Sequence, residues 1–149
     1  LQYHMLRGNE FPPVRANPSD AGLDLRWCPK EASETVHTIL PGESVVLPTG
    51  CKFGIPHGYM MEIKNKSGIA SKRQLLVGAC VVDSGYDGEI FVNLNNIGSD
   101  IAIIHPGQKL AQAVLVPIET CALEEVFEDN VYGKTTSRGS GGFGSTGDF

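Results

Sequence analysis

Short stretches of apolar residues, separated by turn-forming residues, occupy most of the chain between residues 36 and 116. Branched and aromatic side chains are concentrated in segments 36–40, 44–47, 51–55, 59–64, 90–95, 101–105 and 110–116. Pairs such as Pro41-Gly42 and Pro106-Gly107 lie between these segments, at the spacing expected of a β-sandwich or β-barrel. Only residues 67–73 favour a helix. The pattern therefore predicts an all-β fold.

Three stretches within these segments, 44–47, 59–63 and 113–116, are apolar on both faces. A strand with two apolar faces is covered on both sides. In so small a protein, this predicts strands that lie between two sheets, or between a sheet and another subunit. The 149 residues form one domain, which is long enough to bury roughly two-thirds of the surface of its unfolded chain.

The composition indicates in which compartment the protein works and which kinds of partner it binds. No apolar run approaches the roughly 20 residues needed to cross a bilayer, and the N-terminus lacks a signal-peptide pattern, so we expect a cytoplasmic protein without a membrane partner. A net charge of −5 argues against stable nucleic-acid binding, which needs a basic face. The cysteines are far apart and indicate free thiols rather than a zinc site or disulfides: Cys28, Cys51, Cys80 and Cys121.

The C-terminal segment 138–149 combines an arginine, an aromatic ring, hydroxyl groups and many glycines. Glycine allows successive backbone N–H groups to curl around an anion. Arg138 offers a planar fork suited to phosphate, and Phe143 offers a face on which a base could stack. We expect residues 134–149 to be a flexible arm that closes over a nucleotide, following a β core at 1–133. The alternative is a disordered tail.

Segment 78–90 places a carboxylate where packing does not require one. An apolar strand ends at Asp83, and the chain then turns through Ser84-Gly85-Tyr86-Asp87-Gly88. Turn geometry accounts for the glycines. Asp83 could align or deprotonate a water molecule, and Tyr86 could lie beneath a sugar ring. The alternative is an ordinary hairpin with a solvated Asp83.

Three further positions are candidates for binding an anion or a metal ion. Ser67 is a plausible N-cap of the short helix, and with Lys66 beside it the helix start resembles an anion site. Asp24, between Leu23 and Leu25, could bind Mg²⁺ directly or through water. Gln112 is polar within an apolar strand and needs a partner if it is buried. A basic turn, a structural aspartate and an outward-facing glutamine are the alternatives.

In order, these segments resemble the five motifs of the trimeric dUTPase (deoxyuridine triphosphate nucleotidohydrolase) family: 20–25, 66–70, 78–88, 107–112 and 138–147. The resemblance implies a jelly-roll subunit in a homotrimer, with active sites between subunits and the fifth motif supplied by a different subunit from the third. It implies hydrolysis of dUTP to dUMP and pyrophosphate, with Mg²⁺ on the triphosphate and water attacking the α-phosphorus. Such an activity limits uracil incorporation into DNA and supplies dUMP for dTMP synthesis.

The resemblance also implies roles for individual residues. Asp83 would activate the attacking water, Tyr86 would pack against deoxyribose, and the hairpin backbone from Cys80 through Val82 would read the uracil edge. Asp24 would position the metal shell through water. The remaining residues would contact phosphate, a bridging water or the uracil face: Lys66, Ser67, Gly68, Gln112, Arg138, Phe143, Gly144, Ser145 and Thr146.

Some positions depart from the family pattern. Lys66 stands where arginine is usual, which loses a bidentate fork, and Asp87 reverses the usual positive charge. Two other functions remain open. A dCTP deaminase of the same fold needs a protonatable carboxyl beside the base, and Glu89 is near in sequence but follows the turn with no sign of burial. A nucleotide-gated regulatory protein would also use an arm that becomes ordered; the sequence indicates no additional protein partner.

Overall fold

The computed structural model describes residues 1–8, 10–134, 136–142 and 145. Its strands are short, and its helices are a single α-helix and a 3₁₀ turn within the described part of the chain. The elements are β1 (Gln2–Met5), β2 (Leu23–Arg26), β3 (His37–Ile39), β4 (Ser44–Pro48), β5 (Cys51–Gly54), β6 (Tyr59–Lys64), α1 (Ser67–Arg73), β7 (Leu75–Val77), β8 (Val81–Val82), β9 (Phe91–Asn96), β10 (Ala102–Ile104), β11 (Lys109–Pro117) and η1 (Glu128–Asn130).

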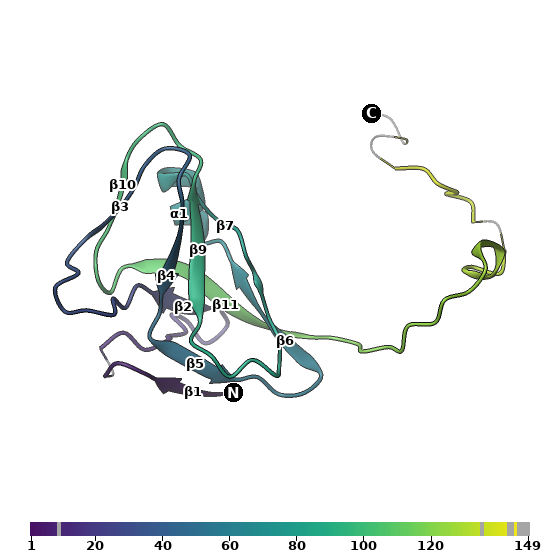
Figure 1. Ribbon diagram of the computed structural model, residues 1–149, viewed down its shortest axis with the longest axis horizontal. Coiled ribbons are helices and arrows are strands. Elements are labelled where there is room, and N and C mark those ends of the chain that lie inside the picture. The colour runs from purple at the N-terminus through teal and green to yellow at the C-terminus, as the bar shows by residue number, and fades with distance from the viewer. Residues whose placement is uncertain (9, 135, 143–144, 146–149) are drawn as a thin grey trace. The chain divides into compact units, whose positions relative to one another are not determined.

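The strands form antiparallel sheets, as Figure 1 shows. One sheet has the order β2-β11-β6-β8, a second has the order β4-β9-β7, and β1-β5 and β10-β3 are two-stranded ribbons. β11 is central to the first sheet because it pairs with β2 on one side and with β6 on the other. The prediction of an all-β fold is confirmed.

Alternation along the strands builds the core. In β9, Val92 and Leu94 are fully buried, whereas Phe91 and Asn93 are half-buried on the opposite face. This is the two-residue period of a strand with one face against the interior. The core gathers side chains from every sheet: Leu25, Trp27, Ile39, Leu47, Phe53, Met61, Ile63, Leu75, Ile90, Val92, Leu94, Ile104, Leu110 and Ala113.

All seven predicted strands are present, with ends shifted by one residue at most. β1, β2 and β7 were not among the predicted strands, and the apolar strand expected to end at Asp83 is β8; β7 and β8 have only three and two residues, too few to display a period. The helix at 67–73 is confirmed. Its predicted N-cap is wrong: Lys66, with extended backbone, is the N-cap and makes no side-chain capping bond, so Ser67 is the first helical residue.

The chain divides into two compact units, Leu1–Glu119 (unit 1) and Thr120–Phe149 (unit 2). After β11, the Ile118 N–H donates to Gly58 O, and residues 119–134 are exposed. The division therefore precedes the boundary expected at residue 134, because burial stops where β11 ends. No helix in the described part of the chain is long and apolar enough to span a membrane.

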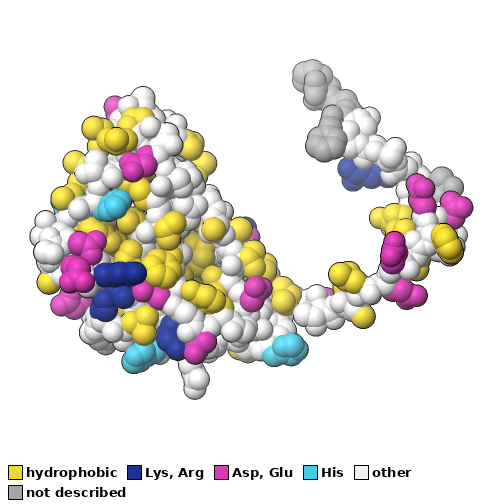
Figure 2. All heavy atoms as spheres, viewed as in Figure 1, with side chains coloured by type: hydrophobic (Ala, Val, Ile, Leu, Met, Phe, Trp, Pro, Cys, Tyr) yellow, Lys and Arg dark blue, Asp and Glu magenta, His cyan; other side chains and the backbone are white. Residues whose placement is uncertain are grey.

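Unit 1 leaves several apolar side chains at its surface, as Figure 2 shows. A group of them lies on and beside the β10-β3 ribbon, where each is about half exposed: Val36, Leu40, Ile101 and Ile103. The core residues described above do not cover this group.

Candidate active site

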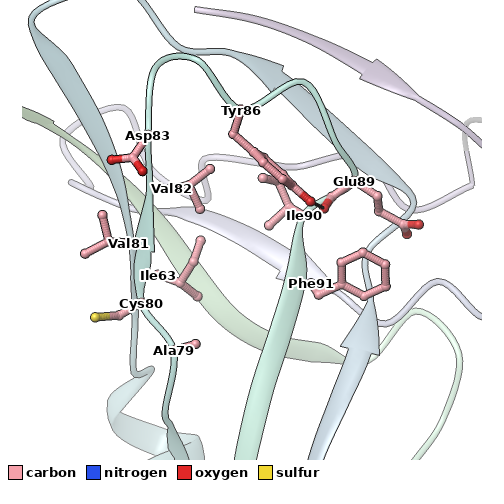
Figure 3. A pocket seen from close by; sticks show the side chains of 10 residues that line it. All are labelled: Ile63, Ala79, Cys80, Val81, Val82, Asp83, Tyr86, Glu89, Ile90 and Phe91. Atoms are coloured by element: carbon pink, nitrogen blue, oxygen red, sulfur yellow. Dashed lines mark hydrogen bonds between the residues drawn. The ribbon is translucent and has the colours of Figure 1, made fainter.

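A cavity of about 220 Å³ lies beside the turn that joins β8 to β9; we call it the hairpin cavity. Hydrophobic residues from β6, β8 and the start of β9 make up most of its wall, and Figure 3 shows them around Tyr86. Its lining residues are Ile63, Ala79, Cys80, Val81, Val82, Asp83, Tyr86, Glu89, Ile90 and Phe91. The volume is below the roughly 300–1,000 Å³ of sites for drug-sized ligands, so it suits a single ring.

Pairing of β6 with β8 positions this wall. Val82 lies opposite Met61, and the Ile63 N–H donates to Cys80 O at 2.7 Å. The chain then reverses, with the Tyr86 N–H donating to Asp83 O at 3.1 Å. The side of the cavity toward Cys80 therefore consists of backbone fixed by the sheet, which is a suitable surface for reading the edge of a planar ligand.

Asp83 and Val82 point to opposite sides of the strand. In Figure 3, Val82 is directed toward Tyr86 and Ile90, while the Asp83 carboxylate is directed away from them. This is the alternation of neighbouring strand residues. Asp83 is exposed, and its carboxylate makes no side-chain hydrogen bond or ion pair with another described residue. It is therefore free to contact a water molecule or a ligand outside the wall.

Tyr86 is fixed at one end and open on its side. Its hydroxyl donates to the Glu89 backbone carbonyl at 2.8 Å. The ring lies over Gly88 so closely that a Cβ at Gly88 would be 2.4 Å from the phenolic carbon. The side chain remains 45% exposed. A ring held in this way can support a flat, partly apolar group such as a sugar.

The Glu89 side chain is largely buried, although the sequence shows no sign of burial there. Its side chain is only 10% exposed and pairs with the Arg7 guanidinium, 82 residues away in sequence. No local pattern in the sequence indicates this burial, because the partner comes from the segment after β1. The hydrogen bond that Arg7 donates to the Glu89 carboxylate is the main cause of the raised pKa of Arg7. Figure 3 shows the Glu89 carboxylate directed away from the centre of the cavity, which does not favour the deaminase alternative.

A second group of polar side chains, the Asp24 cluster, comprises Asp24, Lys66, Lys109 and Gln112. Asp24 lies opposite Gln112 in the β2-β11 register, and its side chain is only 5% exposed. Lys66 Nζ lies 2.5 Å from one carboxylate oxygen and Lys109 Nζ lies 2.5 Å from the other. Burial raises the pKa of Asp24, but hydrogen bonds from Lys109 and Lys66 outweigh it, so the pKa lies below its ordinary value.

Gln112 has the partner that its strand position requires. Its Nε2 donates to Asn65 O at 2.9 Å, and a Cβ at Gly22 would be only 2.2 Å from its Oε1. Gly22 is therefore needed for the close approach of β2 to this side chain. The Asp24 cluster thus joins residues from the first, second and fourth of the sequence motifs.

Among the described residues, no hydrogen bond or ion pair connects the Asp24 cluster with Asp83 or Tyr86. Ser67 and Gly68 are exposed at the start of α1. In unit 2, Arg138 is exposed and its Nε donates to Gly141 O, and Ser145 is exposed. The predicted sites Phe143, Gly144 and Thr146 lie outside the described residues.

The donors present suit a metal ion that arrives with its ligand. The described part of the chain contains no group of three His, Cys, Asp or Glu side chains able to hold a metal. The Asp24 carboxylate already contacts two ammonium groups. Mg²⁺ often keeps several waters and is held by one or two carboxylates together with substrate phosphates. The donor set therefore fits an ion held mainly by phosphates.

Asp87, which departs from the family pattern, forms an ion pair with a nearby lysine. The Asp87 carboxylate pairs with Lys52 on β5, and Lys52 Nζ also lies 3.4 Å from Asp87 O. The Asp87 side chain is 88% exposed, so this pair contributes little to stability. The negative charge at Asp87 is accommodated by a lysine of the neighbouring ribbon.

Comparisons with known proteins agree with this geometry. The sequence model of the dUTPase family matches residues 11–147. Deoxyuridine 5'-triphosphate nucleotidohydrolase from Chlamydia trachomatis is 38% identical over 138 residues, covering 91% of this chain and 90% of the relative. The protein of that name from Anaplasma marginale is 40% identical over 141 residues, covering 91% and 88%.

Solved structures of phage dUTPases share the fold. A mutant dUTPase of Staphylococcus bacteriophage 80alpha, with dUpNHpp, superimposes with a TM-score of 0.84 at 27% identity, covering 98% of this chain and 97% of that chain. A mutant dUTPase from phage phi11 of S. aureus, which coordinates a structural Mg(II) ion, gives 0.74 at 28% identity, covering 85% and 97%. The fold is therefore the jelly-roll type of these enzymes, and the chain belongs to the dUTPase family.

Proposed function

We propose that this chain hydrolyses dUTP to dUMP and pyrophosphate, and thereby limits uracil incorporation into DNA. The observation that carries the proposal is the β8–β9 hairpin. It provides a ring-sized cavity, an aromatic face at Tyr86 and an unpaired, exposed carboxylate at Asp83 within a few residues. In a chain of the dUTPase family, these features correspond to a site for base, sugar and attacking water.

Base and sugar recognition follow from the shape of the hairpin cavity. Uracil would enter between Ile63 and Val82, with backbone groups near Cys80 at its edge. The hairpin backbone from Cys80 to Tyr86 would lie against the edge of the base and leave no room for a 5-methyl group, which would distinguish uracil from thymine. Deoxyribose would lie on the exposed face of Tyr86, where a ribose 2′-hydroxyl would meet the ring.

Asp83 is the proposed general base. Its carboxylate would align a water molecule and accept its proton as the water attacks the α-phosphorus. Charge accumulates on the leaving pyrophosphate, and cations stabilise it. We propose that Lys66, Arg138 and the N–H groups at Ser67, Gly68 and the glycine-rich arm supply this stabilisation. Phe143 would cover the base, with Gly144, Ser145 and Thr146 at the phosphates.

Mg²⁺ is the proposed cofactor, held mainly by the triphosphate, where it would neutralise charge on the phosphates. Asp24 would contact its shell through water, and Gln112 would hold a nearby water or phosphate. The donor set of the Asp24 cluster and the Mg(II) ion of the phi11 relative support this assignment.

A homotrimer is the proposed assembly. Two observations support it. Within one chain, no hydrogen bond or ion pair among the described residues links the Asp24 cluster with Asp83 or Tyr86, and apolar side chains remain exposed around the β10-β3 ribbon. Combining these parts from different subunits would complete the site and bury apolar surface.

The test is release of pyrophosphate from dUTP, dCTP, dTTP and UTP in the presence of Mg²⁺. We expect release from dUTP alone. Asp83→Asn should lower kcat by about 10²-fold or more while retaining affinity for a non-hydrolysable dUTP analogue. Asp87→Asn, which removes the same charge from the same turn, is the matched control and should retain activity.

The other outcomes separate the alternatives. Binding of dUTP without release of pyrophosphate would favour a nucleotide-gated regulatory protein. Ammonia released from dCTP would indicate a deaminase. Loss of nucleotide affinity in Asp83→Asn would contradict the role of Asp83 as a base.

A further inference from the structure

Arg7 and Glu89 form an ion pair at the rim of the hairpin cavity, outside every motif that the sequence indicates. We propose that this pair consists of positioning residues: it fixes the Tyr86 ring and thereby sets the discrimination between 2′-deoxyribose and ribose. The inference rests on the proposed function, because it assigns a selectivity to the same site.

The Glu89 carboxylate is held on both oxygens. Arg7 donates from Nη1 to Oε2 at 3.0 Å and from Nη2 to Oε1, and the Gly50 N–H donates to Oε1 at 2.7 Å. Arg7 Nη2 also donates to Cys28 O at 3.2 Å. The paired side chains are 25% and 10% exposed. A forked arginine–carboxylate pair with little exposure fixes direction as well as distance.

The same residue holds Tyr86. The Glu89 backbone carbonyl accepts the hydrogen bond of the Tyr86 hydroxyl, drawn as a dashed line in Figure 3. Among the described residues this is the one hydrogen bond of that hydroxyl. The peptide group of this carbonyl is held on one side by the Ile90 N–H, which donates to Cys51 O at 2.8 Å. On the other side, the contacts of the carboxylate with Arg7 and Gly50 restrain Glu89 itself. The far end of the Tyr86 ring therefore depends on both restraints.

Backbone hydrogen bonds hold the segment that contains Arg7. Arg7 follows β1, which pairs with β5, and the neighbouring Leu6 N–H donates to Gly50 O at 2.7 Å. The guanidinium therefore extends from the β1-β5 ribbon toward the hairpin. The Tyr86 turn contains Gly85 and Gly88 and is exposed at its tip, so it needs an external support to hold one geometry.

Loss of the pair should change selectivity more than it changes folding. Removing one partner leaves the other charge poorly solvated, and Glu89 then moves to reach water. The Tyr86 ring would shift with it and leave space for the 2′-hydroxyl. Displacements of about 1 Å can alter turnover by 10²-fold, so a smaller shift suffices to weaken discrimination.

The experiment compares kcat/KM for dUTP with kcat/KM for UTP in the full chain with Mg²⁺. The ratio of the two constants does not depend on the fraction of folded enzyme, so a loss of stability alone cannot move it. Glu89→Gln and Arg7→Met should each lower the ratio about tenfold or more, since outer contacts of an active site commonly contribute 10–100-fold. The double variant should be no worse than either single one, because both changes break one interaction.

Two controls complete the design. Glu43→Gln alters a carboxylate that also accepts a backbone N–H, from Leu40 at 2.7 Å, but lies in a turn away from the cavity lining; its ratio should equal that of the wild type. Arg7→Lys keeps the charge without the fork, and should give an intermediate ratio. It also provides a measurement if Glu89→Gln does not fold.

An unchanged ratio in Glu89→Gln or Arg7→Met, with only a lower melting temperature, would overturn the inference and leave the pair a structural role. A wild-type enzyme that hydrolyses dUTP and UTP equally well would also overturn it. Failure of the proposed function is distinguishable, because the wild type would then release no pyrophosphate from dUTP.

Discussion

At the scale of single residues, Asp24 illustrates how the fold constrains a candidate metal contact. The carboxylate is nearly inaccessible and lies between Lys66 and Lys109. Any contact with a metal ion must therefore compete with two ammonium groups or pass through a water molecule. Lys66 is limited in the same way, since its ammonium group contacts Asp24 before any phosphate is bound.

This arrangement predicts a pH dependence of stability. The pKa of Asp24 in the folded chain lies below its ordinary value, despite the opposing effect of burial, because Lys109 and Lys66 bind the ionised form. Its stabilisation is therefore complete above the ordinary pKa of about 3.9, and is lost as the pH falls through the lower, folded-state value. Asp24→Asn should be less stable than wild type at pH 7, by about 1.5–3 kcal/mol.

The measurement is the free energy of unfolding in urea, at fixed protein concentration, as the pH is lowered from 7 to below the ordinary pKa of an aspartate. The difference between wild type and Asp24→Asn should shrink in acid, because the wild-type carboxyl becomes neutral too. A difference that stays constant over this pH range would show that the ionised form contributes nothing.

Sequence reasoning identified single residues better than their partners. Asp83, Tyr86 and Gln112 stood out because each is a polar or aromatic group where a strand or turn does not need one. Arg7 and Lys109 did not, and Glu89 was considered only for the deaminase alternative, because the importance of all three comes from contacts between distant segments. Ion pairs such as Arg7–Glu89, 82 residues apart, leave no local pattern in the sequence.

At the scale of elements, two glycines of the turn after β8 have different surroundings: Gly88 lies against the Tyr86 ring, whereas open space surrounds Gly85. A Cβ at Gly88 would lie 2.4 Å from the Tyr86 ring, whereas a Cβ at Gly85 would meet nothing within 4 Å. The two glycines therefore differ in function within a single turn. The periodicity of the sequence could not separate them, since both are ordinary turn residues.

Gly88→Ala should therefore displace the Tyr86 ring and lower kcat/KM for dUTP by about tenfold or more, because the sugar loses its support. Gly85→Ala, in the same turn, should retain activity. Both variants should keep a near-wild-type melting temperature, since neither glycine is buried in the core. Equal activities of the two variants would show that the contact between Gly88 and Tyr86 does not affect turnover.

The elements themselves were predictable where they are long. β6 and β11 have clear apolar patterns and were expected within one residue at each end. β8, which carries the wall of the hairpin cavity, has two residues and depends on pairing with β6. The element closest to the proposed chemistry was thus the one that tertiary contacts, and not local propensity, determine.

At the scale of the whole molecule, unit 1 holds both the core and the hairpin of the proposed site, whereas the proposed arm belongs to unit 2. The buried core belongs to unit 1, which ends at Glu119. Deletion of residues 138–149 should therefore shift the melting temperature very little, while turnover of dUTP should fall sharply, because the proposed mechanism takes phosphate and base contacts from the arm. Scanning calorimetry and pyrophosphate release on the same sample test both expectations. Full activity of the truncated chain would eliminate the arm from the proposed mechanism.

The proposed sharing of sites between subunits makes a stronger prediction, which combines this truncation with Asp83→Asn. Each variant alone should be inactive, because one lacks the arm and the other lacks the base. If a subunit other than the one that carries Asp83 supplies the arm, then trimers formed by refolding the two variants together contain some sites with both parts intact. Random mixing in equal amounts should restore about one quarter of wild-type activity, since half of the hairpins and half of the arms are functional. Mixing the folded proteins without unfolding them is the control and should restore activity only as fast as subunits exchange. If refolded mixtures stay inactive, although both variants are present in one assembly, then arm and hairpin act within a single chain, and the proposed sharing of sites between subunits is wrong.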